Sequence, residues 1–236
     1  LIEAEERLDL IHLLEQEHEH QVIKLAGGGS AANTIVIVAQ LGGSAFYSCK
    51  VADDDTGTFF LTDLEEAGVD TNLTDKREPG VTGECISMVT PDAERTMTTH
   101  LGITQDFSTS ELSPEALKQS TCLYIEGYLV SSPSAFEAVL EAQAIARAAG
   151  IEVSLTLSDP TMIENFKNKF EQIVSPGVDI LFCNEDEAKL WTGASKREEA
   201  ISTIKSSFPK FAITCGKDGA IVCDGEETSL IPGIQT

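Results

Sequence analysis

The segment GGGSAAN, residues 27–33, combines a bare backbone with polar side chains that could bind a ligand. Three consecutive glycines let another group approach the main chain closely, because no side chain stands in the way. The apolar run that follows predicts a helix that begins within this segment. Asn33 would lie in the first turn of that helix, where its amide offers a donor and an acceptor to adjacent hydroxyl groups. The segment therefore predicts a hydroxyl-binding site.

The same segment also fits a dinucleotide-binding motif. Residues 27–32 read as G-x-G-x-x-A between a short predicted strand and a helix, and Asp53 follows the next predicted strand. A nicotinamide-dependent dehydrogenase would use these residues to bind pyrophosphate and ribose. A pyrophosphate would gain nothing specific from Asn33, so the sequence favours the binding of hydroxyls.

A second polar segment follows the predicted strand DILFC. Asn184 and Glu187 are three residues apart, which places them on one face of a helix. An amide and a carboxylate in that arrangement can hold hydrated Mg²⁺. The alternative is that Asn184 caps the helix and Glu187 is an acid in its first turn. Taken alone, the two residues favour the cap.

A third segment, ITCGKDGAIV, places Thr214, Gly216 and Gly219 directly after another predicted strand. A glycine turn there could present backbone N–H groups to phosphate oxygens. An ordinary β-hairpin turn would explain the same residues. Because three such segments all follow strands, we expect them to meet in one cleft at the carboxyl edge of a sheet.

The predicted elements alternate between strands and helices, which indicates an α/β fold with a mostly parallel sheet and helices on its faces. No linker interrupts the alternation, so residues 1–236 are expected to form one principal domain. The strands are predicted at 22–25, 44–51, 121–126, 151–157, 178–183 and 210–215, and the helices at about 31–41, 56–67, 133–149, 160–174, 185–192 and 196–207.

Three helix starts carry clear capping signals. Ser132-Pro133 and Asp159-Pro160 each place a capping side chain before a proline in the first helical position. Ser195 followed by Glu198 predicts a capping box. Residues 2–20 are expected to form an amphipathic helix, and His12, His18 and His20 are interpreted as its solvated end in preference to a metal site.

Residues 81–102 interrupt the alternation with two β-rich runs that flank the sequence PDAE. This pattern predicts a hairpin insertion, roughly residues 77–103, that projects as a lid over a ligand. A hairpin at the edge of the main sheet is the alternative. Arg95 on this hairpin could reach phosphates, or could instead pair with Asp92 or Glu94.

Composition excludes several partners. Sixteen Lys and Arg against 39 Asp and Glu give a formal net charge of −23, which would repel nucleic acid and anionic membranes. No apolar run reaches membrane-spanning length and no signal segment opens the chain, so a cytoplasmic protein is expected. The six cysteines are widely spaced and are interpreted as small buried hydrophobes.

Several motifs occur in a characteristic order along the chain: GGGSAAN followed by QLGG, then TPDAERTM, YIEGYLV, LSDP, NEDEAKLWTG and ITCGKDGA. Together they resemble the ribokinase family, also called the PfkB carbohydrate kinases. LSDPTMIENF is similar to the adenosine-kinase-like branch of that family. The resemblance covers essentially the whole chain.

The resemblance implies a ribokinase-like three-layer sandwich with a small β lid and a kinase activity. The protein would transfer the γ-phosphoryl group of ATP, with Mg²⁺, to a primary hydroxyl of a nucleoside or sugar, with adenosine favoured. A monomer or a homodimer is compatible with it. By this resemblance the substrate would be bound by Gly28, Gly29, Ser30 and Asn33, the phosphates and ATP by Arg95, Asn184, Thr214, Gly216 and Gly219, and the metal by Glu187.

The sequence also departs from the family pattern. The D-T-x-G-A-G-D segment, which supplies the catalytic aspartate, is expected beyond Thr236, and the opening strand with its substrate-binding aspartate is also absent. We expect residues 1–236 alone to be inactive and the parent protein to be a kinase. A non-catalytic nucleoside-binding protein on the same fold is the second hypothesis, and a dehydrogenase is the third.

Overall fold

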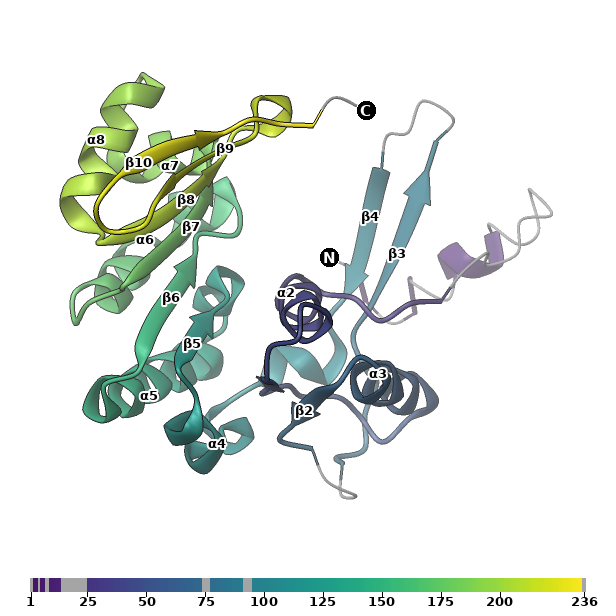
Figure 1. Cartoon of the computed structure of the whole chain (residues 1–236). Coiled ribbons are helices and arrows are strands. Elements are labelled where there is room, and N and C mark those ends of the chain that lie inside the picture. Colours follow the sequence, from purple (N-terminus) through teal and green to yellow (C-terminus); the bar gives the residue numbers. More distant parts are fainter. Residues whose placement is uncertain are drawn as a thin grey trace. The chain divides into compact units, whose positions relative to one another are not determined.

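The computed structural model describes residues 2–3, 5–6, 9–13, 25–73, 77–90 and 95–234. The chain divides into two compact units, residues 1–111 and 112–236, which we call unit 1 and unit 2. Figure 1 shows the elements of both units. The expectation that the two units form one domain stays a prediction.

Unit 2 is built on a six-stranded sheet with the order β10-β9-β8-β7-β6-β5. Neighbours in the sheet are also neighbours along the chain. The pairs from β5 to β8 are parallel, while β9 and β10 are antiparallel. The strands are β5 (Cys122–Ile125), β6 (Glu152–Thr156), β7 (Ile180–Asn184), β8 (Lys210–Thr214), β9 (Ala220–Cys223) and β10 (Thr228–Ile231).

Helices α5 to α8 contact one another in sequence order and lie along the sheet of unit 2 (Figure 1). In β7, Leu181 and Cys183 are buried whereas Phe182 between them is 37% exposed, because only alternate side chains point towards the helices. The helices are α4 (Pro114–Gln119), α5 (Pro133–Ala149), α6 (Pro160–Val174), α7 (Glu185–Thr192) and α8 (Arg197–Ser207), with short 3-10 turns η3 (Gly127–Ser131) and η4 (Gly216–Asp218).

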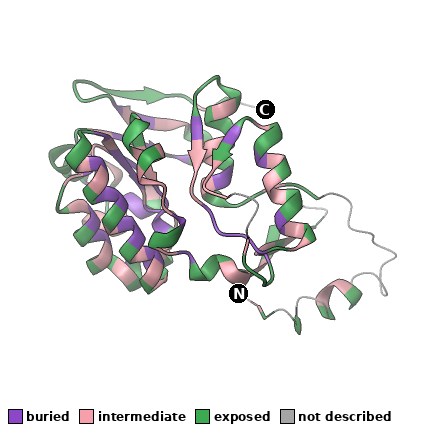
Figure 2. Cartoon of the chain, turned by 90° about the horizontal axis from the view of Figure 1, so that it is seen from below, coloured by how far each residue is buried: buried purple, intermediate pink, exposed green. Residues whose placement is uncertain are grey.

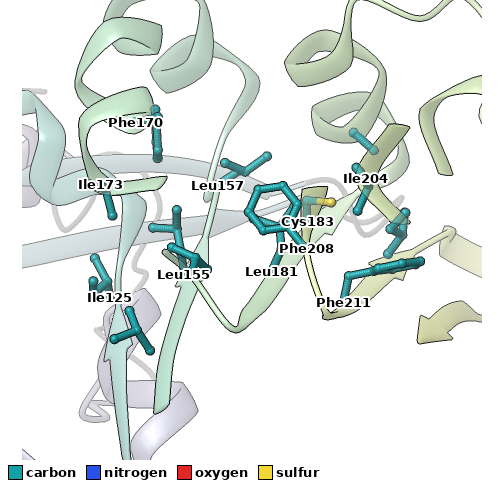
Figure 3. Packing of buried hydrophobic residues seen from close by; sticks show 14 of the residues in the cluster. Ile125, Leu155, Leu157, Phe170, Ile173, Leu181, Cys183, Ile204, Phe208 and Phe211 are labelled. Atoms are coloured by element: carbon teal, nitrogen blue, oxygen red, sulfur yellow. The ribbon is translucent and has the colours of Figure 1, made fainter. Parts of the chain in front are cut away.

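The core of unit 2 lies between this sheet and the helices. Figure 3 shows Phe170 and Ile173 of α6 near Leu155 and Leu157, and Ile204 of α8 near the strand that carries Phe211. These side chains are at most 1% exposed. Burial of large apolar side chains is the main favourable contribution to folding. This cluster therefore stabilises the sheet whose strands β7 and β8 end at the candidate residues Asn184 and Thr214.

Unit 1 contains a smaller parallel pair and a separate hairpin. Ala45, Leu64 and Val69 form its small core. The elements are α2 (Ser30–Gln40), β1 (Ala45–Tyr47), α3 (Asp55–Glu66), β2 (Val69–Thr71), the antiparallel strands β3 (Glu84–Val89) and β4 (Arg95–His100), and the 3-10 turns η1 (Gly102–Asp106) and η2 (Thr109–Glu111).

Most predicted elements are confirmed. Helix α5 spans the predicted residues 133–149, α6 spans 160–174, and α7 spans 185–192. The strand predicted at 44–51 is shorter, because only Ala45–Tyr47 pairs with β2. The predicted strand at 22–25 lies outside the described residues except for Leu25, which is not in a strand. The short elements β2, α4, β9 and β10 were not among the predicted strands and helices, although the alternative of a β-hairpin turn after Thr214 implies β9.

The helix at the start of the chain is described only in part. Residues 5–6 and 9–13 are helical, as expected for residues 2–20. His18 and His20 lie outside the described residues, whereas His12 is described and exposed. None of the described helices is both long and apolar enough to cross a membrane.

The cysteine interpretation is correct for four residues and wrong for two. Cys49, Cys183, Cys215 and Cys223 are buried, but Cys85 and Cys122 are exposed. Cys85 lies on the more exposed face of β3, where burial alternates along the strand. The apolar character of a segment therefore did not reveal which face each side chain occupies. Figure 2 shows how buried and exposed residues are distributed.

The capping predictions are confirmed at two helices and wrong at a third. Ser132 caps α5 and Asp159 caps α6, each with proline in the first turn. Ser195 does not cap α8. That helix begins one residue later, with Lys196 in the capping position and no side-chain hydrogen bond there. Arg197, the first helical residue, instead bonds to Glu185, and this tertiary contact accompanies the shifted start.

Replacement of the two serines tests this difference. Ser132→Ala removes the acceptor for the N–H of Ala135 and should lower the free energy of unfolding by about 1 kcal/mol. The control Ser195→Ala removes an exposed hydroxyl and should change it by less than about 0.5 kcal/mol. Denaturant unfolding of both variants provides the measurement, and equal losses would contradict the assignment.

Candidate functional site

The glycine segment of unit 1 leads directly into helix α2. Gly29 is the capping residue and has φ +107°, a conformation that favours glycine. No side chain caps the helix, and Ser30 and Asn33 are exposed in its first turn. A Cβ atom added to Gly28 would meet nothing within 4 Å. The backbone at Gly28 is therefore open to an approaching group.

The absence of a side chain at Gly27 is explained by packing within the protein. A Cβ atom at this position would overlap the carboxylate of Asp63 on α3. The bare backbone at Gly27 thus accommodates a side chain that lies 36 positions further along the chain. Sequence reasoning missed Asp63, because an acid in an acidic amphipathic helix resembles any solvated residue.

Gly28, Asn33 and Asp63 line one pocket between α2 and α3, with a volume of about 230 Å³. Apolar side chains form the rest of its wall. Such a combination of a few polar groups with an apolar lining is typical of small-molecule sites. Ser30 and Gly29 do not line this pocket, and the complete lining is Gly27, Gly28, Ala32, Asn33, Val36, Ile37, Phe60, Asp63 and Leu64.

The predicted hairpin is present as a sheet of its own, in which β3 pairs with β4 over six residue pairs. Its role as a lid stays a prediction. Arg95 is the first residue of β4, lies opposite Val89, and is exposed. The alternative partners Asp92 and Glu94 lie outside the described residues. The role of Arg95 therefore stays a prediction.

Asp53, which the dehydrogenase hypothesis requires, is used differently. Its carboxylate lies 3.2 Å from a guanidinium nitrogen of Arg77, and its N–H donates to the carbonyl of Glu78. The residue also follows β1 by six positions and does not end that strand. These contacts give Asp53 a structural role and leave the dehydrogenase hypothesis without support.

In unit 2, parallel pairing brings two candidate residues together. Asn184 ends β7, Thr214 ends β8, and the two are partners in the register of the sheet. They stand side by side at its carboxyl edge, where open α/β sheets bind ligands.

Asn184 and Glu187 form a capping box at the start of α7. The side chain of Asn184 accepts from the N–H of Glu187 at 2.8 Å and donates to Glu187 Oε1 at 2.6 Å. Glu187 in turn accepts from the N–H of Asn184 at 3.0 Å. The helix-capping alternative is confirmed, and it holds both side chains in fixed positions.

Glu187 is only 4% exposed. Burial raises the pKa of its carboxyl group, the N–H of Asn184 opposes this, and the charges of Asp159 and Glu126 raise the pKa further. A bound cation would relieve the repulsion among these carboxylates. Within the described ranges no three acidic, histidine or cysteine side chains gather closely enough to bind a metal by themselves. Mg²⁺ commonly completes its coordination with water and phosphate oxygens, so this edge fits an ion that is bound jointly by the protein and a phosphate ligand.

Sequence reasoning did not assign a role to Glu126 or Ser158. Glu126 follows β5 and is 7% exposed, and its Oε1 accepts a short hydrogen bond from the hydroxyl of Ser158. Ser158 has φ +68° and is the only residue other than glycine with a positive φ in the part of the chain that the structure describes. The segments YIEGYLV and LSDP carry these residues, but their sequence gives no sign of the contact.

The glycine turn after β8 is a β-hairpin turn, as the alternative predicted. Gly219 donates its N–H to Gly216, and its carbonyl accepts from Cys215. A Cβ atom at Gly219 would overlap the carbonyl of Ile231, whereas one at Gly216 would meet nothing within 4 Å. Gly219 is therefore needed for packing, and Gly216 is the position of the turn that is open to a ligand.

The family model for the pfkB family of carbohydrate kinases matches residues 1–236. This chain belongs to that family, and its fold is the ribokinase-like α/β fold. It is 26% identical over 217 residues to the ribokinase of Mus musculus, with 89% of this chain and 64% of the relative covered. The chain therefore spans somewhat less than two thirds of that relative.

Solved structures agree with this assignment. The adenosine kinase of Sinorhizobium meliloti is 32% identical, with a TM-score of 0.88, and the match covers 100% of this chain and 70% of that one. A protein of E. coli described as a ribokinase II, in complex with ATP and Mg²⁺, is 21% identical with a TM-score of 0.77. That match covers 94% of this chain and 74% of the other, and it supports the fold alone.

Two glycines of one turn provide a test of the packing assignment. Gly219→Ala should lower the free energy of unfolding by more than about 2 kcal/mol, because it adds a steric overlap to a positive φ of 98°. Gly216→Ala should cost about 1 kcal/mol, since its φ of 55° is tolerable and its surroundings are open. Thermal and denaturant unfolding measure both losses, and a larger loss for Gly216→Ala would contradict the assignment.

The raised pKa of Glu187 predicts a pH dependence of stability. The ionised carboxyl is disfavoured in the fold, so its cost is absent below the ordinary pKa of 4.5 and appears as the pH rises through the raised value. Glu187→Gln should therefore become more stable relative to wild type between pH 4 and pH 8 in thermal melts.

Glu185→Gln serves as the control in the same helix turn. Hydrogen bonds from Arg197 and Lys189 lower the pKa of Glu185, so its favourable contribution is present above the ordinary pKa and is lost as the pH falls through the lowered value. This variant should lose stability relative to wild type as the pH rises. The same slope for both variants would refute the assignment.

Proposed function

We propose that the protein is an ATP-dependent kinase that transfers a γ-phosphoryl group to a primary hydroxyl of a nucleoside or sugar, with adenosine as the favoured acceptor. The observation that carries the proposal is the pairing of Asn184 with Thr214 beside the buried Glu187, in a chain of a kinase family. We further propose that it acts in the cytoplasm, as a monomer or homodimer.

The acceptor is assigned to unit 1. Sugar hydroxyls would be bound by the open backbone at Gly28, the capping residue Gly29, the first-turn residue Ser30 and the amide of Asn33. Support comes from the open space at Gly28 and from the position of Asn33 in the pocket wall. Adenosine is favoured because of the LSDPTMIENF segment and the likeness to an adenosine kinase, while the ribokinase relative supports ribose.

ATP is assigned to unit 2. Thr214 and Gly216 would contact the nucleotide, and Asn184 and Glu187 would orient Mg²⁺ and its water. The cation would supply charge neutralisation of the transferred phosphoryl group. Support for the role of Mg²⁺ comes from the acidic character of this edge, which would repel ATP that carries no cation. Gly219 is assigned to the shape of the turn, and Arg95 to the phosphates.

The test is a transfer assay with the complete protein, labelled ATP and a panel that contains adenosine, other nucleosides and ribose. We expect a phosphorylated acceptor whose formation stops when EDTA removes Mg²⁺. Asn33→Ala should raise the acceptor KM about tenfold or more, because the partner hydroxyl loses its hydrogen bonds. Asn165→Ala, an exposed asparagine on α6, is the matched control and should leave it unchanged.

Two results would contradict the proposal. Binding of adenosine with no phosphorylated product would favour a non-catalytic nucleoside-binding protein on the same fold. An equal loss of acceptor affinity in Asn33→Ala and Asn165→Ala would remove the assignment of the acceptor to the α2 pocket.

A further inference from the structure

Arg197 occupies an electrostatically unfavourable position. It is the first residue of α8, and the amino end of a helix carries a partial positive charge. Acidic residues are favoured there, and Glu198 and Glu199 follow that preference. A guanidinium at this point needs compensating contacts, and those contacts indicate what the residue does.

The compensation comes from two other segments of unit 2. Arg197 Nε donates to Glu185 Oε2 at 2.7 Å, and a second guanidinium nitrogen also donates to that oxygen. The same nitrogen lies 3.4 Å from Asp218 Oδ2. Glu185 additionally pairs with Lys189 at 2.5 Å. One planar guanidinium thus contacts two carboxylates from different segments.

Both carboxylates belong to segments that the proposed function assigns to the nucleotide. Glu185 follows Asn184 directly and opens α7. Asp218 lies between Gly216 and Gly219 in η4. Asn184 and Thr214 are already paired in the sheet. The contacts of Arg197 with Glu185 and Asp218 add a second link between the two segments, and this link restricts how far the Gly216 turn can move away from the start of α7.

We infer that Arg197 is a positioning residue that holds the Gly216 turn against the start of α7 and thereby sets the affinity for ATP. This inference rests on the proposed function and adds a residue outside its motifs. Arg197 does not itself need to contact the nucleotide. Its effect on the turn depends on a planar guanidinium that contacts two carboxylates at once, and lysine lacks such a group.

The experiment compares Arg197→Gln with Arg147→Gln in the complete protein. Arg147 pairs with Asp179 at 3.0 Å. The substitution Arg147→Gln therefore removes an ion pair of the same kind elsewhere in unit 2. The side chains are also similarly exposed, 33% and 24% for Arg197 and Glu185 against 30% and 30% for the control. A loss of stability that both variants share is therefore separated from a loss of ATP affinity that is specific to the Gly216 turn.

We expect Arg197→Gln to weaken binding of a non-hydrolysable ATP analogue with Mg²⁺ about tenfold in calorimetry, and Arg147→Gln to leave it unchanged. Arg197→Lys should recover only part of the loss. The acceptor KM should stay the same in all variants. In a double-mutant cycle, Asp218→Asn should add little to Arg197→Gln.

Hydrogen exchange gives a readout that does not depend on activity. The amides of Gly216 to Gly219 should exchange faster in Arg197→Gln than in wild type and in Arg147→Gln. Unchanged exchange, or equal loss of analogue affinity in both variants, would overturn the inference. Absence of analogue binding to wild type would overturn the proposed function and the effect on ATP, whereas the exchange result would still decide whether Arg197 holds the turn.

Discussion

The parallel pairing of β7 with β8 is the constraint on which the candidate nucleotide site depends. Parallel strands end at the same edge of a sheet, and the register places Asn184 beside Thr214. The capping box then fixes Glu187, and the turn after Thr214 presents Gly216. The core beneath these strands is almost fully buried, so the edge has little freedom to rearrange.

Charge is the second feature that shapes this edge. The chain carries a formal net charge of −23, and the carboxylates of Glu126, Asp159 and Glu187 repel one another here. A protein of this composition can bind a polyanion only where a cation or backbone donors offset the repulsion. Mg²⁺, which the proposed function pairs with ATP, would meet that requirement and would link the acidic composition to the proposed chemistry.

The glycines show why a motif does not reveal its own cause. Gly27 makes room for Asp63, Gly219 packs against the backbone at Ile231, and Gly28 and Gly216 face open space. All four lie in segments that resemble ligand-binding turns. Two of them serve the fold, and two are available to a ligand, because a missing side chain can admit either another part of the chain or a small molecule.

The sequence by itself determined the elements whose signals are local. Proline caps and apolar periodicity located α5 and α6 to the residue, and the order of motifs indicated the family. Only the tertiary structure decided the contacts between distant segments: Asp63 against Gly27, Ser158 on the buried Glu126, and Arg197 between Glu185 and Asp218. The physical reason is that a cap or a helical stripe depends on neighbours within a few positions. Burial and ion pairing depend on which segments the fold brings together.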